Sequence, residues 1–281
     1  MKIKELLVNG TQILNKQNIQ DSAIQARVLL SYVLKMDKNK LIINSEQTVE
    51  NLEEKIYLEA IEKIANGKPI QYITNQQEFM KLNFYVDENV LIPQPDTEIL
   101  VEEVLKFTTT MNTQIKILDL CTGSGAIGIS LAKYIPNSKV WVSDISNKAI
   151  QIAKLNAERN LVHRRMNFIE SDMFKKIEEN QFDIIVSNPP YIKTKVIKTL
   201  PDQVREEPHI ALDGGRDGLE FYKIIANEAS NYLKKDGKMF LEIGFDQKDE
   251  VIEILKNTGK YDNIECIKDL AGNDRVIICK K

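Results

Sequence analysis

The sequence predicts an α/β protein in which a doubly wound sheet of parallel strands follows a helical N-terminal block. Two observations support this prediction. From about residue 98 onward, short apolar segments alternate with segments of helical length, which is the pattern of βα units. Residues 1–75 instead carry apolar side chains at helical spacing in several short segments. Because ligands of such sheets bind outside the carboxyl ends of the strands, functional residues are expected in the loops there.

The composition narrows the class of protein. The chain has 281 residues, which is long enough to bury a large core without disulfides or structural metals. It has 38 Lys and Arg against 41 Asp and Glu, a net charge of −3, and 43% hydrophobic residues. This composition excludes a largely disordered chain. The absence of a basic excess argues against a dedicated nucleic-acid-binding protein, and the balanced charge fits a monomer.

The spacing of the cysteines and the length of the apolar runs indicate in which cellular compartment the protein is expected. Cys121, Cys266 and Cys279 stand far apart and form no C-x-x-C pair, so neither a disulfide framework nor a metal site is expected. A reducing, cytoplasmic environment follows. No apolar run is long enough to span a membrane, and the first residues, with an early acid at Glu5, do not resemble a signal peptide.

Residues 1–75 are predicted to form a small helical bundle that packs or docks a substrate. The first apolar stripe consists of Ile24, Val28 and Tyr32, with Leu29 and Val33 beside them. The second consists of Leu52, Ile56, Ala60 and Ile64. Asp21 is placed to cap the first helix, and Gly67 to end the second.

Residues 76–92 are predicted to form a β-hairpin linker, because aromatic and polar residues alternate there with a turn signal at residues 87–89. The prolines of the next segment, residues 92–98, prevent regular structure. Asp96 or Thr97 can cap a helix that begins near Glu98.

Residues 93–281 are predicted to form the sheet domain. Strands are expected at residues 115–120, 139–143, 167–170, 182–186, 238–243, 263–267 and 275–279. Helices are expected at residues 126–134, 147–160, 221–233 and 247–258. Residues 182–186 are almost wholly apolar, as buried parallel strands are.

The first βα turn combines small residues with an acid. It reads Asp119-Leu120-Cys121-Thr122-Gly123-Ser124-Gly125. Small residues let the backbone turn sharply and approach a ligand closely. A tight turn without a ligand is the alternative for this segment taken alone.

Acids also follow the second and third strands. Asp144 lies roughly twenty residues beyond the glycines, where an acid can accept hydrogen bonds from both hydroxyls of a ribose. Its alternative role is to cap the next helix. Asp172 and Met173 can bind the amino group and the ring of an adenine, or they are a loop cap and a core methionine.

The fourth strand ends in Asn188-Pro189-Pro190-Tyr191, which predicts the catalytic site. Consecutive prolines fix the backbone and leave a rim of carbonyl groups. The Asn188 side-chain oxygen and the Pro189 carbonyl can accept both N–H groups of a planar nitrogen, and Tyr191 adds an aromatic face. Because the tetrad holds no strong base, we expect positioning to dominate its chemistry, which suits methylation. The tetrad alone fits an adenine N6 amine and a glutamine amide equally.

The segments around these motifs resemble the HemK-type peptide chain release factor glutamine N5-methyltransferases. The resemblance covers nearly the whole chain and includes Gly-Lys-Pro-Ile-Gln-Tyr-Ile at residues 67–73 and Leu-Ile-Pro-Gln-Pro-Asp-Thr-Glu at residues 91–98. Further matching segments are residues 78–79, 119–125, 186–192, 207–208, 211–219, 241–244 and 269–275. So many separate segments in the same order favour glutamine over adenine. An adenine-N6 methyltransferase of DNA or RNA is the alternative function, and a non-catalytic cofactor-binding module is a second alternative.

The resemblance implies a seven-stranded, Rossmann-like methyltransferase domain that uses S-adenosyl-L-methionine. It implies that the substrate is the glutamine of the Gly-Gly-Gln loop in bacterial class I release factors, methylated at N5. The implied cofactor contacts are Cys121, Thr122, Gly123, Ser124, Gly125, Asp144, Met173 and Asn188. The implied substrate contacts are Asn188, Pro189, Pro190 and Tyr191.

Two residues depart from the family pattern, because many relatives have Gly at the position of Cys121 and Arg at the position of Gln94. Cys is small, so the turn should survive, and we do not interpret Cys121 as a reactive thiol. The long, charged loop at residues 193–218 is expected to help the bundle hold the release factor.

Overall fold

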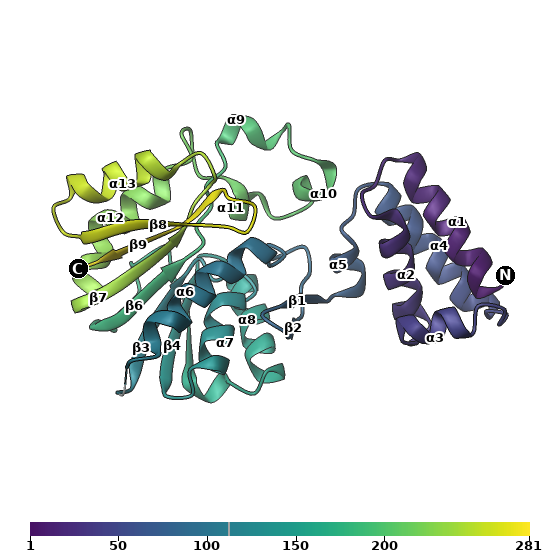
Figure 1. The fold of residues 1–281 in the computed structure, drawn as a ribbon, viewed down its shortest axis with the longest axis horizontal. Helices are drawn as coiled ribbons and strands as arrows, with labels where there is room; N and C mark the ends of the chain where they lie inside the picture. Colours follow the sequence, from purple (N-terminus) through teal and green to yellow (C-terminus); the bar gives the residue numbers. More distant parts are fainter. Residues whose placement is uncertain (112) are drawn as a thin grey trace. The chain divides into compact units, whose positions relative to one another are not determined.

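The chain folds into two compact units. The computed structural model describes residues 1–111 and 113–281. The unit that we call the helical unit comprises Met1–Asn75 and Pro201–Glu206. The unit that we call the sheet unit comprises Gln76–Leu200 and Glu207–Lys281. Figure 1 shows both units, and none of the helices in the described part of the chain is long and apolar enough to cross a bilayer.

The helical unit is a small bundle around one apolar core, which confirms the predicted helical N-terminal region. Its helices are α1 (Ile3–Lys16), α2 (Ser22–Val33), α3 (Lys38–Ile43), α4 (Asn51–Ala65), α5 (Ile70–Thr74) and α10 (Asp202–Arg205). The core fully buries Leu6, Leu29, Tyr57 and Ile61. The Tyr57 hydroxyl donates a hydrogen bond to the Leu6 carbonyl at 3.3 Å, so this buried polar group has a partner.

The predicted apolar stripes of this unit were partly wrong. Leu52 and Ile56 are 68% and 46% exposed, whereas Ala60 and Ile64 of the same stripe are buried. A strict four-residue repeat advances by about 40° around a helix at each step, so it leaves the buried face after a few turns. Ile24 and Tyr32 of α2 are also exposed, and α2 packs through Ala26, Leu29 and Leu30.

Asp21 is the N-cap residue of α2, as predicted, but its side chain does not cap the helix. Asp21 adopts a left-handed conformation with φ of 52°, and its side chain accepts no capping hydrogen bond. Its backbone carbonyl instead accepts from the Ile24 and Gln25 N–H groups. The start of the helix is therefore set by backbone geometry. The stop at Gly67 is confirmed, since α4 ends two residues before it and Gly67 has φ of +97°.

A short hairpin opens the sheet unit, but it does not turn where the sequence predicts. Strands β1 (Gln77–Phe79) and β2 (Leu82–Phe84) pair antiparallel, and the chain turns at Met80 and Lys81, with φ of 50° and 58°. Two-residue hairpin turns of type I′ require positive φ at both turn residues, and Gly or Asn normally signals such a turn. Here the turn is held from outside, because the Met80 N–H donates to the Glu98 carboxylate at 2.6 Å and the Tyr134 hydroxyl donates to the Met80 carbonyl at 2.6 Å.

The predicted turn signal at residues 87–89 forms a local loop instead. The Asn89 N–H donates to the Asp87 side chain at 2.9 Å, and the Val90 N–H donates to the Asp87 carbonyl at 3.1 Å. Asp favours such local bonds wherever the chain bends, so its presence does not identify a hairpin.

The sheet unit contains a seven-stranded sheet in the order β5-β4-β3-β6-β7-β9-β8 (Figure 1). The strands are β3 (Ile115–Leu120), β4 (Ser138–Asp144), β5 (Met166–Glu170), β6 (Phe182–Ser187), β7 (Leu233–Glu242), β8 (Asp262–Lys268) and β9 (Asp274–Lys280). Strands β3 to β7 pair parallel, whereas β9 is antiparallel to both of its neighbours. The predicted doubly wound α/β fold is confirmed. The chain adds β4 and β5 on one side of β3 and then crosses back to add β6 on the other side. Ligands of such sheets bind at this switch point, outside the carboxyl ends of β3 and β6.

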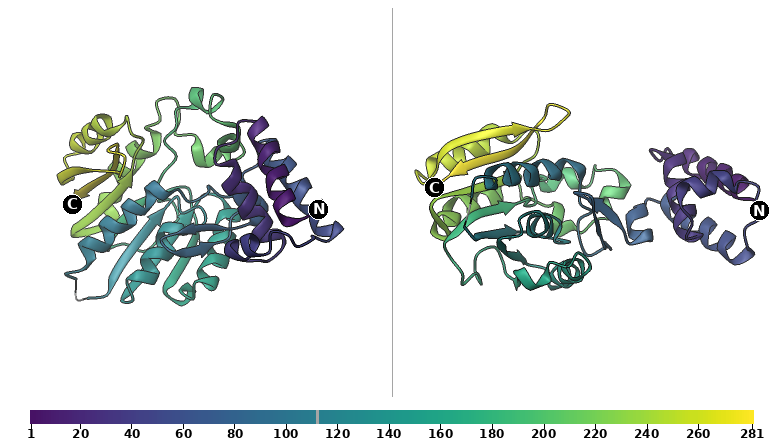
Figure 2. Two further views of the ribbon diagram at one scale, coloured as in Figure 1. Left: turned by 45° about the vertical axis from the view of Figure 1, so that its right-hand side comes forward. Right: turned by 60° about the horizontal axis from the view of Figure 1, so that its bottom comes forward.

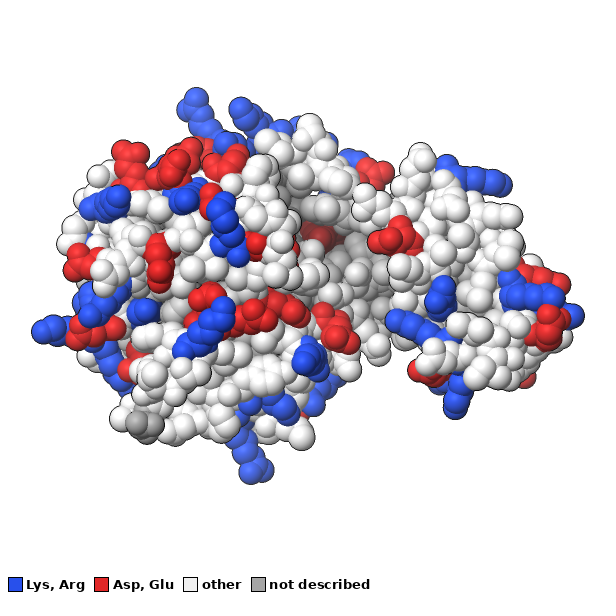
Figure 3. Space-filling view, viewed as in Figure 1, with Lys and Arg blue, Asp and Glu red and all other residues white. Residues whose placement is uncertain are grey.

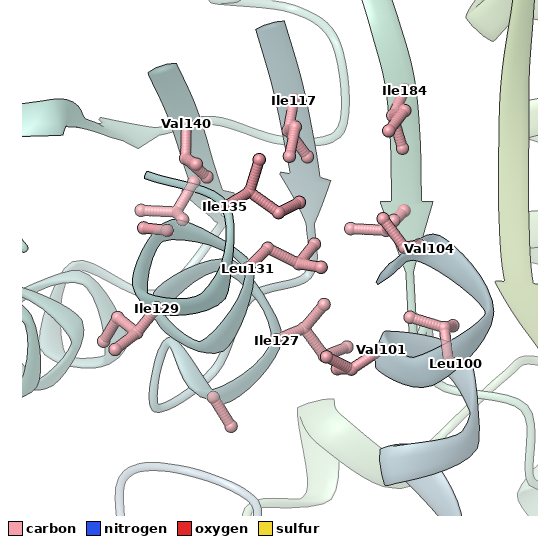
Figure 4. Packing of buried hydrophobic residues seen from close by; sticks show 14 of the residues in the cluster. Leu100, Val101, Val104, Ile117, Ile127, Ile129, Leu131, Ile135, Val140 and Ile184 are labelled. Carbon is pink, nitrogen blue, oxygen red and sulfur yellow. The ribbon is translucent and has the colours of Figure 1, made fainter. Parts of the chain in front are cut away.

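Helices cover both faces of the sheet (Figure 2). One face carries α6 (Glu98–Thr108), α7 (Ala126–Tyr134) and α8 (Asn147–Arg159), and the other carries α12 (Glu220–Tyr232) and α13 (Lys248–Asn257). Neighbouring strand residues divide between the two faces of the sheet. Ile117 and Ile184 pack under α6 and α7 (Figure 4). Leu118 and Ile185 pack on the opposite face, under α12. Burial on both faces explains why the strand sequences are continuously apolar. The short helices are η2 (His163–Arg165), α9 (Thr194–Ile197) and α11 (His209–Leu212).

A 3₁₀ turn, η1 (Pro95–Thr97), runs directly into α6. The Glu98 N–H donates to the Pro95 carbonyl, so the first turn of α6 already has backbone partners. Thr97 makes no capping bond, and the Asp96 carboxylate lies 3.2 Å from the Arg275 guanidinium. Thr97 is the N-cap residue of α6, as predicted, but among the described residues its side chain makes no capping hydrogen bond, and Asp96 does not cap the helix.

Candidate active site

A cavity of about 480 Å³ lies at the carboxyl ends of the parallel strands. Its walls come from the loops that follow β3, β4, β5 and β6, from the chain around residue 90, and from α11 and α12. The site residues predicted from the sequence that line it are Cys121, Gly123, Asp144, Asp172, Met173, Asn188 and Pro190. This volume is within the range of small-molecule sites.

The glycine turn after β3 is organised by a buried acid. The Asp119 carboxylate accepts from the Thr122 hydroxyl at 2.6 Å and from the Gly128 N–H at 2.9 Å. Burial raises the pKa of Asp119 to about 7, and these two donors partly oppose the shift. Thr122 therefore faces the protein interior, and with Ser124 and Gly125 it is not among the residues that line the cavity.

Two residues of this turn have left-handed backbone conformations that determine what can stand there. Gly125 has φ of +84°, and a Cβ atom would lie 2.7 Å from Ile129 Cδ1 and 3.1 Å from Ala153 Cβ. Cys121 has φ of +58°, a backbone conformation that glycine adopts without steric cost. Its Sγ lies 3.9 Å from Met173 Sδ, and burial raises the pKa of the thiol far above its usual value. The raised pKa favours the protonated thiol over the thiolate.

Asp144 connects the turn to the next strand. Its carboxylate accepts from the Gly123 N–H at 2.9 Å and from the Ser146 N–H at 2.9 Å. The alternative role of Asp144 as a helix cap is wrong, because the Ser146 hydroxyl caps α8 by accepting from the Ala149 N–H at 3.2 Å. Burial raises the pKa of Asp144, and the backbone donors oppose this shift. The carboxylate keeps free acceptor positions on the cavity side.

Asp172 and Met173 lie together on the next wall. The Asp172 carboxylate pairs with the Lys175 ammonium at 2.6 Å and is about half exposed. Met173 is buried with φ of 48°, and the Ser171 hydroxyl donates to its carbonyl at 2.9 Å. The loop after β5 thus holds one polar and one apolar side chain at the cavity. This arrangement fits both predicted roles, which are adenine binding and a loop cap with a core methionine.

The tetrad after β6 is fixed by its surroundings. The Ile192 N–H donates to the Leu212 carbonyl at 3.0 Å, and the Gln247 side chain donates to the Tyr191 carbonyl at 3.0 Å. Gly214 packs so closely that a Cβ atom would lie 2.7 Å from Tyr191 Cα. Pro189 and Tyr191 are not among the residues lining the cavity, whereas Asn188 and Pro190 are.

A polar cluster behind Asn188 was not identified from the sequence. The Asn188 amide donates to the Thr97 hydroxyl at 3.2 Å, and Glu242 lies buried at the end of the neighbouring strand β7. Burial raises the pKa of Glu242 to about 7, opposed by hydrogen bonds from Thr97 and Asn188. Glu242 ends a strand beside β6, and that position is the signal that could have identified it. Gln94, the other departure from the family pattern, donates to the Ile92 carbonyl at 2.9 Å.

Comparisons with known proteins agree with this architecture. Residues 5–74 match the family described as PrmC N-terminal domain, and residues 95–207 match the Methyltransferase small domain. The release factor glutamine methyltransferase of Clostridium acetobutylicum is 44% identical over 281 residues, covering 99% of this chain and 98% of that protein. The enzyme of the same name from Clostridium botulinum is 41% identical over 284 residues, covering both chains completely.

A solved structure extends the likeness to the fold. A methyltransferase from Pyrococcus furiosus has 22% identity and a TM-score of 0.53, covering 78% of this chain and 96% of that one. At that identity the match shows a common fold. The full-length relatives confirm the resemblance inferred from the sequence motifs. The chain is a methyltransferase that belongs to the release factor glutamine methyltransferase family.

Proposed function

We propose that this enzyme transfers a methyl group from S-adenosyl-L-methionine to the side-chain N5 of the glutamine in the Gly-Gly-Gln motif of bacterial release factors. The observation that carries this proposal is the engagement of the Asn188 amide nitrogen by Thr97, which leaves the Asn188 Oδ1 as an acceptor at the cavity. A carboxamide substrate offers two N–H donors to such acceptors. The names of the full-length relatives support the same substrate.

The residues at the cavity fit the cofactor. Asp144 offers a carboxylate to a ribose diol, Gly123 leaves room beside the backbone, and Met173 offers an apolar surface for a base. When bound, S-adenosyl-L-methionine supplies an electrophilic methyl group. We include Thr122, Ser124 and Gly125 in the cofactor site as the residues that shape the turn from behind.

The protein's contribution to the reaction is positioning. An amide nitrogen is a poor nucleophile, because its lone pair is delocalised. In this proposal the Asn188 Oδ1, which lines the cavity, accepts one of its hydrogens, and the carbonyl of Pro189, which is outside the cavity lining, accepts the other. These two bonds orient the nitrogen and favour the positive charge that develops on it. Pro190 and Tyr191 keep this backbone rigid and exclude water beside it.

The helical unit and the loop at residues 193–218 are proposed to dock the release factor. That loop contributes Pro208, Ile210 and Ala211 to the cavity wall, so a protein bound to it would reach the site. Exposed apolar side chains on the helical unit, such as Leu52 and Ile56, suit a protein partner.

Methylation of an adenine amine in nucleic acid is the second candidate. Over the face of the sheet unit seen in Figure 3, acidic and basic side chains are interspersed, without the continuous basic stripe that a phosphate backbone requires. The net charge of −3 gives no general attraction to nucleic acid either. These observations favour the protein substrate.

The test is methyl transfer from labelled cofactor to either a release factor or nucleic acid, followed by mass spectrometry of the Gly-Gly-Gln peptide. We expect one added methyl on the glutamine, and none after Asn188→Ala. The matched control is Asn227→Ala, because Asn227 is an exposed residue of α12 whose amide bonds within its own helix. Label in the nucleic acid, or full turnover by Asn188→Ala, would contradict the proposal.

A further inference from the structure

A buried acid stands directly beside the tetrad asparagine. Ser187 of β6 pairs with Leu241 of β7 in the parallel register. Asn188, which follows β6, and Glu242, the last residue of β7, therefore lie side by side. The Glu242 side chain is 2% exposed, and its Oε2 atom has no hydrogen-bond partner among the described residues. A carboxylate with an unpaired oxygen is costly to bury, so a purely structural position would favour an apolar residue or a glutamine.

Thr97 joins this acid to the asparagine. The Thr97 side chain is 4% exposed, and its Oγ1 accepts from the Asn188 Nδ2 at 3.2 Å. The side chains of Thr97 and Asn188 both act to lower the pKa of the Glu242 carboxylate, against the effect of its burial, so both lie beside it. Three side chains from η1, the β6 end and the β7 end therefore form one polar cluster.

The direction of hydrogen bonding in this cluster follows from the chemistry of its members. An ionised carboxylate can only accept, and a hydroxyl has one hydrogen to give. In the state in which Glu242 is ionised, Thr97 donates to it, and the Thr97 oxygen then has only acceptor capacity left for Asn188. The two ends of an asparagine carboxamide have nearly the same shape, so packing alone does not distinguish them. The acceptor oxygen of Thr97 does distinguish them, because it can bond only the NH₂ end of the carboxamide.

The other charged and titratable groups around Glu242 have their own partners or no charge. The Arg275 guanidinium from β9 pairs with Asp269 at 3.1 Å and with Asp96 at 3.2 Å, so two other carboxylates balance it. Burial raises the pKa of Tyr191 to about 12 and that of Tyr222 well above its usual value, so both phenols stay neutral. Glu242 is therefore not required as the counter-ion of Arg275.

We propose that Glu242 and Thr97 are positioning residues that fix the orientation of the Asn188 carboxamide, so that its oxygen faces the substrate amide. The inference rests on the proposed function, because it concerns how a substrate N–H group is received. With the carboxamide reversed, an NH₂ group would face the NH₂ group of the substrate, and two donors cannot bond each other. The cluster thereby selects a substrate that donates at this position.

The first test compares two substitutions of Thr97. Thr97→Val keeps the shape but removes the hydroxyl, and Thr97→Ser keeps the hydroxyl. With release factor as substrate, we expect kcat to fall by roughly tenfold or more in Thr97→Val, the order of one lost oriented hydrogen bond at a polar site. We expect Thr97→Ser to retain most of kcat, and calorimetric affinity for S-adenosylhomocysteine to change by less than about threefold in both.

The matched control is Thr109→Val, because Thr109 is exposed at the end of α6 and its hydroxyl bonds the Lys106 carbonyl. It should behave as the wild type. An unchanged kcat in Thr97→Val, or an equal loss in Thr97→Ser, would overturn the positioning role. A parallel loss of cofactor affinity and thermal stability would reveal a merely structural role and would overturn it as well.

The second test separates this inference from the proposed function. In the full-length protein bound to S-adenosylhomocysteine, NMR should show a nuclear Overhauser contact between the Asn188 NH₂ hydrogens and the Thr97 methyl group. In Glu242→Gln, the new amide can donate to the Thr97 hydroxyl, which reverses the direction of the hydrogen bonds in the cluster. This substitution should therefore weaken the nuclear Overhauser contact. Absence of the contact in the wild type overturns the inference whatever the activity. A wild type with this contact that methylates no glutamine would refute the proposed function and leave the orientation established.

Discussion

The Asp144 carboxylate accepts a hydrogen bond from the Gly123 N–H at 2.9 Å, which ties the end of β4 to the turn after β3. Because the same carboxylate lines the cavity, it both shapes the glycine turn and offers acceptors to a ligand. Asp144→Ala should therefore weaken binding of S-adenosylhomocysteine by about 1–3 kcal/mol, measured by calorimetry. Asp262→Ala, at an exposed position on β8, serves as the control. Unchanged affinity in Asp144→Ala would mean that the ribose is held elsewhere.

Cys121→Gly should preserve the site. The substitution relieves a left-handed backbone at φ of +58° and removes a small, partly buried side chain whose Sγ contacts Met173. We expect stability to change by less than about 1 kcal/mol and cofactor affinity by less than about threefold. Urea unfolding and calorimetry measure the two quantities. A large loss of affinity would instead show that the Cys121 side chain contacts the cofactor directly.

Gly125→Ala should be strongly destabilising, and Gly272→Ala provides the comparison. Both glycines have φ near +85°, but only at Gly125 would the new methyl meet Ile129 and Ala153, since nothing lies within 4 Å at Gly272. The backbone penalty of about 1 kcal/mol is shared. The close contacts should add about 1–3 kcal/mol for Gly125→Ala, measured by urea unfolding. Equal losses would show that the turn relaxes without cost.

Stability should fall as the pH rises through neutrality, in part because of Glu207. Burial raises its pKa from an ordinary 4.5 to about 7, against a hydrogen bond from the Ile92 N–H at 2.9 Å. A raised pKa contributes stability that is fully present below the unfolded value and is lost as pH rises through about 7. Glu207→Gln keeps the acceptor without the charge, so it should exceed the wild type in stability above pH ~7, by up to about 3 kcal/mol.

Urea unfolding at acidic and alkaline pH checks this prediction, with Glu253→Gln on the exposed side of α13 as the control. The stability of Glu207→Gln and wild type should be similar near pH ~4.5 and diverge above it. A constant difference between them at all pH values would contradict titration of Glu207 as the cause.

Removing residues 1–75 tests the docking role of the helical unit. If this unit holds the release factor, KM for the whole factor should rise by roughly tenfold or more, the effect of losing part of a protein interface. KM for a short Gly-Gly-Gln peptide should change much less, and it serves as the internal control. Equal effects on both substrates would reject a docking role.

The strands and helices of the sheet unit could be predicted from the sequence, because strands that are buried on both faces are continuously apolar. Residues 115–120 and 126–134 were predicted with the bounds that the structure has. The hairpin turn was misplaced because Met80 and Lys81 carry no turn signal, and partners distant in sequence, Glu98 and Tyr134, hold it. Local propensity does not contain that information.

The candidate site likewise contains residues whose place could be predicted from the sequence and one residue, Thr97, whose role could not. Asp144, Met173 and Asn188 were predicted because they follow strands whose carboxyl ends meet at one edge, and all three line the cavity. Thr97 was interpreted as a helix cap, since a Thr before a helix commonly is one. Its partnership with Asn188 spans 91 residues and depends on how β6 and α6 pack, which a single segment cannot reveal.

The six residues Pro201–Glu206 belong to the helical unit, although the chain on both sides of them belongs to the sheet unit. The polypeptide therefore passes between the units at three junctions, and residues 1–75 are not a self-contained cassette. An exchange of N-terminal regions between relatives would leave a foreign bundle beside the resident α10. Such chimeras should be built with both segments taken from one parent.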